Sequence, residues 1–227
     1  MEHLNPAKTE ATTKGYRNIF LAEPMEKKQF ANELIESGTA ILRTTGKATE
    51  VFTIDETNRH IVAFMYGWWN NVEHGYNRNA GILICGKIGA GKSILMRAFM
   101  SVLTKYTGKV IFDADCKNFN TQYIEIIDEC KKFSQQRIKI GTDYFKFRPM
   151  YFDDLGRESK QVKIYGTEIS PVPDVLFQRY DTGAYTFATS NFSFDELKKE
   201  SMYGLAIADR LGNMFNVFEM TNKSRRN

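Results

Sequence analysis

The sequence predicts an α/β fold in which a parallel sheet of five strands is flanked by helices. Two observations carry this prediction. The run GILIC at residues 81–85 is wholly apolar, as is typical of a strand buried on both faces of a parallel sheet. From Ala80 onward, strand-like runs alternate with segments whose apolar residues recur at helical spacing. Such alternation indicates a doubly wound sheet, which gathers ligand-binding groups at the carboxyl ends of its strands.

The length and composition fit one globular domain with a small extension. The chain has 227 residues, of which 42% are hydrophobic and 26% charged. We place the extension, a possible partner-binding segment, at residues 1–54 and the domain at residues 55–227. The net charge of +4 permits a nucleic-acid partner without requiring one.

Several classes of protein are not expected. The polar N-terminus (residues 1–17) has no signal-peptide core, and no apolar run approaches the roughly 18 residues of a membrane span. We therefore expect a cytoplasmic protein without a membrane partner. The three cysteines and three histidines have neither disulfide-framework nor metal-ligand spacing, so we expect no bound zinc.

Two helices are predicted before the alternating region. The first covers residues 23–38, with Pro24 in its first turn and Gly38 as its C-terminal cap. Residues 39–54 then resemble two short strands around Gly46. The second helix covers residues 56–75 after Asp55 as N-cap, and we expect its two tryptophans to pack against the sheet.

The alternating region supplies the sheet and its flanking helices. The predicted strands cover residues 81–85, 109–115, 149–156, 184–191 and 216–220, and the predicted helices cover residues 93–105, 120–137, 173–180 and 203–214. Gly108 closes the first of these helices, and Pro171 and Pro173 are tolerated only at the start of the third. Too few residues follow Asn191 for a separate C-terminal lid domain.

The segment GKIGAGKS matches the G-x-x-x-x-G-K-[ST] pattern of a phosphate-binding loop at every fixed position. It lies between a buried strand and a helix, which is the context that this loop requires. Its glycines allow successive N–H groups to surround phosphate oxygens, and the helix presents its positive end to the same anion. We therefore predict an ATP-binding P-loop of eight residues: Gly86, Lys87, Ile88, Gly89, Ala90, Gly91, Lys92 and Ser93.

Two acids follow the strand that ends in MYFDDLGRE. With Ser93, Asp153 is predicted to hold Mg²⁺, directly or through water. Asp154 is placed to orient and polarise the water that attacks the γ-phosphate, with Glu158 as the next candidate. An Asp-Asp-Leu-Gly turn without chemistry is the alternative, but a position one strand-helix-strand interval after the P-loop favours function.

Two later residues have both a functional and an ordinary interpretation. Asn191 ends the fourth predicted strand, where its amide would hold the attacking water or touch the γ-phosphate, or would simply form a turn. Arg210 lies on the last predicted helix, and an isolated helical arginine is usually solvated or salt-bridged. The sequence alone leaves both residues open.

Taken in order, these motifs resemble the DnaC/DnaI helicase loaders and the related IstB transposition ATPases, within the AAA+ group of the P-loop NTPases. The resemblance covers residues 55–227 and rests on five segments: GKIGAGKS, YFDDLGRE, FQRYDTGAYTFATSN, ADRLGNM and FEMTNKSRRN. Loaders of this type also lack the C-terminal lid. Residues 1–54 match no helicase-binding module.

The resemblance also implies roles for individual residues. It makes Asp154 the catalytic acid, Asn191 sensor 1 and Arg210 the arginine finger. Arg225 or Arg226 would correspond to the terminal basic motif that contacts nucleotide.

Three functions follow as hypotheses. The favoured one is a Mg²⁺-dependent ATPase that forms an ATP-dependent homo-oligomer and loads or remodels a replicative helicase on single-stranded DNA. The stretch DYFKFRPMY is compatible with stacking of DNA bases, and equally with a buried strand. The second is an ATP-gated adaptor, as in IstB-like transposition helpers. The third is a small-molecule kinase, which would need an acceptor pocket and an arginine-rich lid that the sequence does not show.

Overall fold

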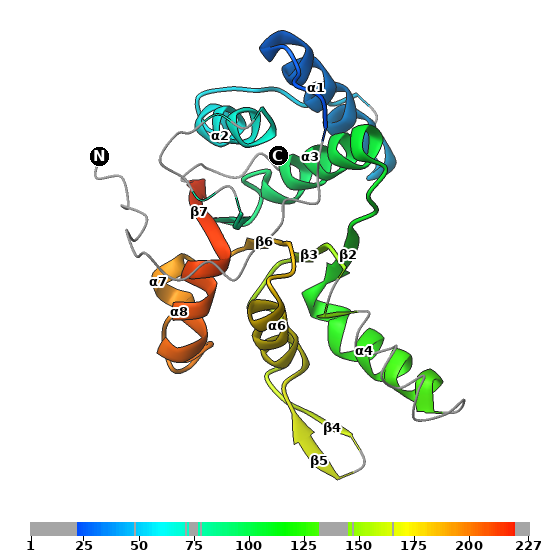
Figure 1. Cartoon of the computed structure of the whole chain (residues 1–227), viewed down its shortest axis with the longest axis vertical. Coiled ribbons are helices and arrows are strands. Elements are labelled where there is room, and N and C mark those ends of the chain that lie inside the picture. Colours follow the sequence, from blue (N-terminus) through cyan, green and yellow to red (C-terminus); the bar gives the residue numbers. More distant parts are fainter. Residues whose placement is uncertain are drawn as a thin grey trace.

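A computed structural model describes residues 22–220 with the exception of residues 48, 71, 73–76, 78, 132–144, 147 and 165. Its central sheet has five parallel strands in the spatial order β2-β3-β6-β1-β7 (Figure 1). The predicted parallel five-stranded sheet is therefore confirmed. Its strands are β1 (Gly81–Gly86), β2 (Phe112–Asp115), β3 (Met150–Asp153), β6 (Thr186–Ser190) and β7 (Phe215–Met220).

Helices cover both faces of this sheet. Figure 1 shows α1, α2 and α3 on one side and α4, α6 and α8 on the other. The helices are α1 (Lys27–Thr44), α2 (Arg59–Trp69), α3 (Lys92–Thr107), α4 (Cys116–Lys131), α6 (Pro171–Thr182), α7 (Phe194–Leu197) and α8 (Gly204–Met214). After β6 the described residues form α7, α8 and β7, with no separate helical lid among them.

Strand β1 shows why the sheet needs both helical layers. Ile82 and Ile84 belong to the hydrophobic cluster under α1, α2 and α3, whereas Leu83 and Cys85 belong to the cluster under α4, α6 and α8. Side chains alternate across a strand, so a wholly apolar strand buries both of its faces. Of the two tryptophans expected to pack against the sheet, Trp68 packs edge-on against Phe187 of β6. Trp69 instead contacts Phe30 of α1 and Tyr106 of α3.

The prediction for residues 39–54 was wrong. Residues 39–44 continue α1, which ends at Thr44 with Thr45 as its C-cap rather than at Gly38, and the described residues between 45 and 55 form no strand. The buried residues of α1 continue past Gly38 at helical spacing to Leu42, so packing on the core extends the helix. Asp55 is not the cap of α2 either: the helix begins after Asn58, and the Asp55 carboxylate instead accepts the N–H of Thr57 (2.9 Å).

Two elements were not predicted. The short helix α7 begins at a capping box of Ser193 and Glu196. The antiparallel hairpin of β4 (Val162–Ile164) and β5 (Thr167–Ile169) turns at Gly166 and projects from the body beyond α6 (Figure 1). Apolar residues that alternate on either side of a glycine were the available signal for this hairpin.

Arg179 of α6 fixes the strand that leads to the predicted sensor. Its side chain is fully buried and donates from Nε to Thr186 Oγ1 (2.9 Å) and from its terminal nitrogens to the carbonyl oxygens of Phe145 and Tyr185. Burial lowers the pKa of Arg179 to about 9, so the side chain stays protonated at neutral pH. Two of these bonds join α6 to the start of β6, and the third joins it to Phe145, which precedes β3.

Candidate nucleotide-binding site

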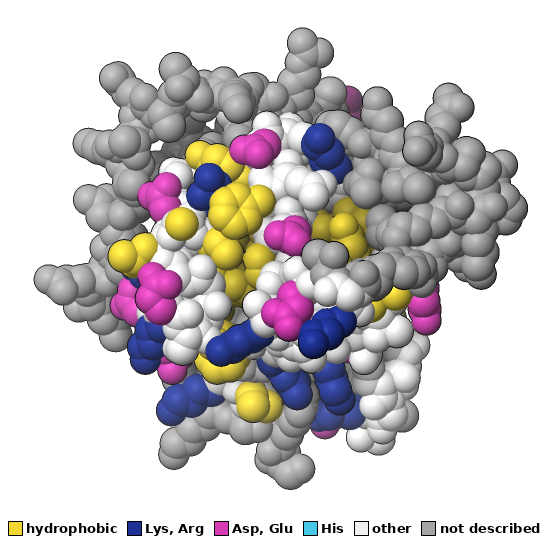
Figure 2. All heavy atoms as spheres, turned by 90° about the horizontal axis from the view of Figure 1, so that it is seen from below, with side chains coloured by type: hydrophobic (Ala, Val, Ile, Leu, Met, Phe, Trp, Pro, Cys, Tyr) yellow, Lys and Arg dark blue, Asp and Glu magenta, His cyan; other side chains and the backbone are white. Residues whose placement is uncertain are grey.

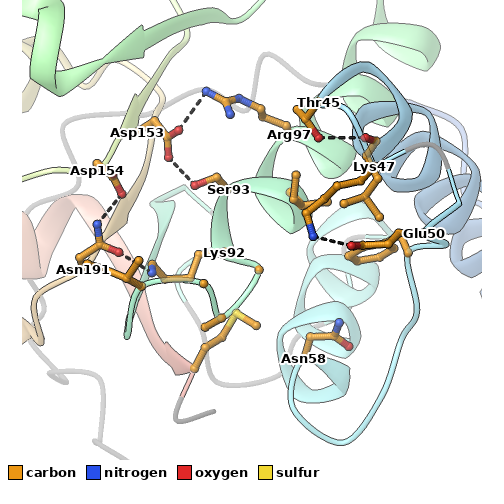
Figure 3. A pocket seen from close by; sticks show the side chains of 18 of the residues that line it. Thr45, Lys47, Glu50, Asn58, Lys92, Ser93, Arg97, Asp153, Asp154 and Asn191 are labelled. Carbon is orange, nitrogen blue, oxygen red and sulfur yellow. Dashed lines mark hydrogen bonds and ion pairs between the residues drawn. The ribbon is translucent and has the colours of Figure 1, made fainter. Parts of the chain in front are cut away.

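A cavity of about 600 Å³ lies at the carboxyl ends of β1, β3 and β6 (Figure 3). Several segments of chain form its walls. They are the P-loop with the first turns of α3, the two acids after β3, Asn191 after β6, the end of α1 with the segment that follows it, and Met220 at the end of β7. The lining residues include Thr45, Lys47, Glu50, Phe52, Asn58, Ile88, Gly89, Lys92, Ser93, Arg97, Asp153, Asp154, Arg157, Asn191 and Met220.

The glycines of the P-loop are required by its backbone. Gly91 is the N-cap of α3 and has φ 100° and ψ 8°, a left-handed conformation that other residues rarely adopt. At Gly86 a Cβ atom would lie 2.2 Å from the carbonyl oxygen of Met220. The loop therefore leaves β1 against the end of β7 and turns directly into α3, whose first amide groups face the cavity.

Lys92 folds back across the mouth of the loop. Its ammonium group donates to the carbonyl oxygens of Gly86 and Lys87 (both 2.9 Å) and to Asn191 Oδ1 (2.8 Å). The side chain is buried, so its charge sits close to the loop amides. This arrangement gathers positive charge where a phosphate group would lie.

Asp153 lies at the end of β3 and is held by four donors. Its Oδ1 accepts the hydroxyls of Ser93 (2.7 Å), Tyr151 (2.6 Å) and Thr189 (2.6 Å), and Arg97 lies 2.9 Å from Oδ2. Burial opposes ionisation of this carboxyl group. The three hydroxyls and the charge of Arg97 nevertheless hold its pKa below the usual 3.8, so Asp153 is an anion at neutral pH.

The oxygens of Ser93 and Asp153 fit the predicted magnesium site. A hydroxyl and a carboxylate are the ligand types that Mg²⁺ prefers, and the two side chains are already in contact. Because Mg²⁺ usually keeps several waters, one or two protein oxygens beside a phosphate site are enough.

Asp154 occupies an unusual backbone conformation. Its φ of 60° is positive, which among the described residues other than glycine occurs here alone. Its side chain accepts Asn191 Nδ2 at Oδ1 (2.8 Å) and pairs with Arg157 at Oδ2 (2.7 Å). Strained backbone of this kind is common at functional sites, and here it turns the carboxylate toward the cavity.

Asn191 connects the loop to the acid. One end of its amide accepts from Lys92 and the other donates to Asp154 (Figure 3). The structure thus brings together Lys92, Asn191 and Asp154, three predicted site residues that are far apart in the sequence. Their catalytic roles remain predictions.

Glu158, the next candidate for the acid, is held away from the cavity. Its carboxylate accepts the N–H of Gly156 (2.9 Å) and the hydroxyl of Tyr203, just before α8. Burial raises the pKa of Glu158 above its usual value. Glu158 therefore anchors the loop after β3 instead of facing a nucleotide.

Of the predicted arginines, only Arg210 is among the described residues, and it lies outside the cavity. Arg210 of α8 is not among the cavity residues; its guanidinium stacks on Phe177 (4.2 Å from the ring centroid) and faces Tyr180 (5.6 Å) on α6. Figure 2 shows the underside of the molecule, on the side of α6 and α8, where apolar side chains lie among acidic and basic ones. Arg225 and Arg226 lie outside the described residues.

Some lining residues were not predicted. Arg97 follows Ser93 by one helical turn, so helical spacing would have placed it on the same face. The segment after α1 carries no motif. It reaches the cavity because Phe52 is buried against α1 and donates its N–H to Thr39 Oγ1 (3.1 Å).

The described aromatic residues of the stretch DYFKFRPMY are buried, which favours the second interpretation left open above. Phe145 and Tyr151 are buried in the core and cannot stack on DNA bases. Tyr144 and Phe147 lie outside the described residues.

Comparison with known proteins identifies the fold. No protein-family model matches the chain, and no curated protein matches its sequence. Among solved structures, the DnaC helicase loader aligns with 17% identity over 76% of this chain and 93% of its own (TM-score 0.53). DnaI aligns with 22% identity over 78% of this chain and 89% of its own (TM-score 0.51).

The fold also matches a replication initiator. DnaA bound to AMPPCP and single-stranded DNA aligns with 16% identity over 76% of this chain (TM-score 0.53). The chain spans about half the length of the DnaA structures, 48% and 49%. The chain thus has the AAA+ fold of the DnaC/DnaI type, as the sequence motifs predicted.

Within the described residues, no helix is both long and apolar enough to cross a bilayer.

Proposed function

We propose that this protein is a Mg²⁺-dependent ATPase of the AAA+ class that loads or remodels a replicative helicase on single-stranded DNA. The observation that carries the ATPase part is the link from Lys92 through Asn191 to Asp154 beside the P-loop. In this link Asn191, which would sense the γ-phosphate, contacts Asp154, whose carboxylate would polarise the attacking water.

The site residues divide the work as follows. The loop amides and Lys92 bind the phosphates, and Lys92 exchanges its carbonyl partners for phosphate oxygens. Mg²⁺, held by Ser93 and Asp153, would neutralise charge on the outer phosphates. Asp154 accepts a hydrogen bond from the attacking water, and Asn191 keeps the carboxylate and Lys92 aligned on the same phosphate.

The end of α1, the segment that follows it and the end of β7 supply a place for the nucleoside. Leu42, Phe52 and Met220 give the cavity an apolar wall, and Thr45, Thr53 and Asn58 add polar groups. A cavity that is part apolar and part polar suits a base and a ribose. Residues 45–58 would therefore contact the nucleotide rather than a protein partner.

The loader role is supported by the fold and by the charge of the sequence. Structures with the same fold are a helicase loader and an initiator bound to single-stranded DNA. The net charge of +4 and the basic sequence NKSRR at residues 222–226 are compatible with phosphate contacts. Single-stranded DNA and a helicase are thus the proposed partners, and the protein would act as an ATP-dependent oligomer.

Phosphate release tests this proposal, measured with the full chain alone, with single-stranded DNA and with candidate small acceptors. We expect slow turnover that DNA stimulates. Slow turnover that DNA leaves unchanged would favour the ATP-gated adaptor, and a phosphorylated acceptor would favour a kinase. DNA affinity should also fall with salt, with a log–log slope of roughly 0.7 per phosphate contact.

Two variants test the site itself. Lys92→Ala should abolish ATP binding, because the point charge that meets the outer phosphates is lost. Asp154→Asn should still bind Mg²⁺·ATP, since Ser93 and Asp153 are intact, while hydrolysis falls steeply. Undiminished nucleotide affinity in Lys92→Ala would refute the assignment of the loop.

A further inference from the structure

Arg97 reaches the proposed magnesium site from the second turn of α3. Its terminal nitrogen lies 2.9 Å from Asp153 Oδ2, and its Nε lies 2.8 Å from Asp113 Oδ2 at the neighbouring strand β2. Its guanidinium also lies over the ring of Tyr151, 5.8 Å from the centroid. Figure 3 shows Arg97 on one carboxylate oxygen of Asp153 and Ser93 on the other.

These contacts leave Asp153 fully engaged. Its Oδ1 already accepts three hydroxyls, and its Oδ2 faces Arg97. A carboxylate attracts a divalent cation through its negative charge and its free lone pairs, and an adjacent guanidinium reduces both. The residue that would hold Mg²⁺ is thus paired with a cation of the same chain.

Arg97 also has a second partner to which it can withdraw. Both carboxylate oxygens of Asp113 lie within 3.5 Å of its nitrogens, and Asp113 is not among the cavity residues. Release of Asp153 would leave the pair with Asp113 intact. The geometry therefore allows two states of Arg97, one on Asp153 and one on Asp113 alone.

We propose that Arg97 restrains metal binding by competing with Mg²⁺ for Asp153, so that it sets how strongly Mg²⁺ promotes nucleotide binding. The proposal rests on the proposed nucleotide site but concerns a residue outside the P-loop and acidic motifs. Arg97 thereby lowers the coupling between metal and nucleotide without preventing either from binding.

The test is the coupling between Mg²⁺ and nucleotide. The dissociation constant of a fluorescent, non-hydrolysable ATP analogue is measured in EDTA and in saturating Mg²⁺. The constant in EDTA divided by the constant in Mg²⁺ is then compared between proteins. Removing one positive charge next to a divalent cation should raise this ratio on the order of tenfold in Arg97→Gln. Arg97→Lys keeps the charge and should stay near the wild-type ratio.

Arg157→Gln is the matched control. Arg157 is a cation of the same cavity, but it pairs with Asp154 rather than Asp153, so its loss should change the ratio much less. Arg97→Met, which keeps the aliphatic stem, replaces Arg97→Gln if circular dichroism shows that the glutamine variant is unfolded. An unchanged or lower ratio in the charge-removing variant would overturn the proposal. Failure of the wild-type protein to bind the analogue would instead refute the nucleotide site.

Discussion

Asn191 is the side chain on which the proposed chemistry depends most closely, because it contacts both Lys92 and Asp154. In Asn191→Ala the carboxylate loses a fixed donor and Lys92 loses an acceptor. We expect hydrolysis to fall by roughly 10²–10³, as for other preorganised hydrogen-bond donors, while nucleotide affinity changes only a few-fold. Steady-state phosphate release and equilibrium nucleotide binding measure the two effects.

Asn118→Ala is a suitable control. The Asn118 amide is exposed and donates to Asp115, which is not a residue of the cavity. It should leave both measurements near wild type. Equal losses of affinity and hydrolysis in Asn191→Ala would mean that Asn191 only supports the loop.

Glu158 makes a prediction about pH. Burial raises the pKa of this carboxyl group above its usual 4.5, so the folded protein binds the proton more tightly than the unfolded chain. Its contribution to the free energy of unfolding is then complete below about pH 4.5 and declines as the pH rises through the folded-state pKa. Relative to Glu158→Gln, the wild-type protein should lose stability in urea titrations as the pH rises above about 4.5.

Glu196 should change stability with pH in the opposite direction. The N–H and hydroxyl of Ser193 lower the pKa of Glu196, so the same comparison with Glu196→Gln should show wild-type stability increasing from low pH toward neutrality. Parallel slopes for the two variants would contradict the assignment of Glu158 as a buried anchor.

Motif spacing predicted the residues whose chemistry depends on type and position, namely the P-loop, Asp153 and Asp154. It did not predict what Glu158 does, because that depends on Tyr203, 45 residues further along the chain. It also missed Arg97, because a charged residue on a helix is usually solvated and only its carboxylate neighbours on two strands give it a role.

At the scale of elements, patterns long enough to fill a helix turn or a buried strand were predictive. Strand β1 and helix α3 lie where expected because their apolar residues are continuous or periodic. The prediction of two strands at residues 39–54 was wrong because short segments of mixed composition take the structure that their neighbours impose. Here α1 packs into the same cluster as α3, and its last turns follow that contact.

Gly38 links α1 to the cavity. A Cβ atom at this position would lie 2.5 Å from Cγ of Phe52, so alanine must displace the ring and the segment that lines the site. We expect Gly38→Ala to cost about 1–3 kcal/mol from overpacking, offset by up to about 1 kcal/mol of helix propensity. Nucleotide affinity should fall several-fold with it. Thermal unfolding and nucleotide titration measure the two changes.

Gly212→Ala is the matched substitution. Its added Cβ would lie 3.7 Å from Phe194, an ordinary contact, so helix propensity should leave the protein as stable or more stable. Wild-type nucleotide affinity in Gly38→Ala would separate the α1 packing from the site and contradict this link.

In the whole molecule, the proposed arginine finger Arg210 lies apart from the proposed catalytic residues of the cavity. The cavity holds Lys92, Asp154 and Asn191, whereas Arg210 stacks on α6 outside it. Arg210 therefore does not serve the site of its own chain in this arrangement. We infer that Arg210 faces the nucleotide of a neighbouring copy.

Subunit mixing tests this inference. Arginine fingers contribute on the order of 10³–10⁵ in rate where measured, so Arg210→Ala should bind ATP nearly normally and hydrolyse it poorly. Asp154→Asn should be inactive for a different reason. In a mixture of the two, some interfaces combine an intact Asp154 with an intact Arg210 from the next subunit. Those interfaces should recover activity in proportion to their frequency. If activity stays absent while exchange of labelled subunits is observed, Arg210 acts within its own chain or has no catalytic role.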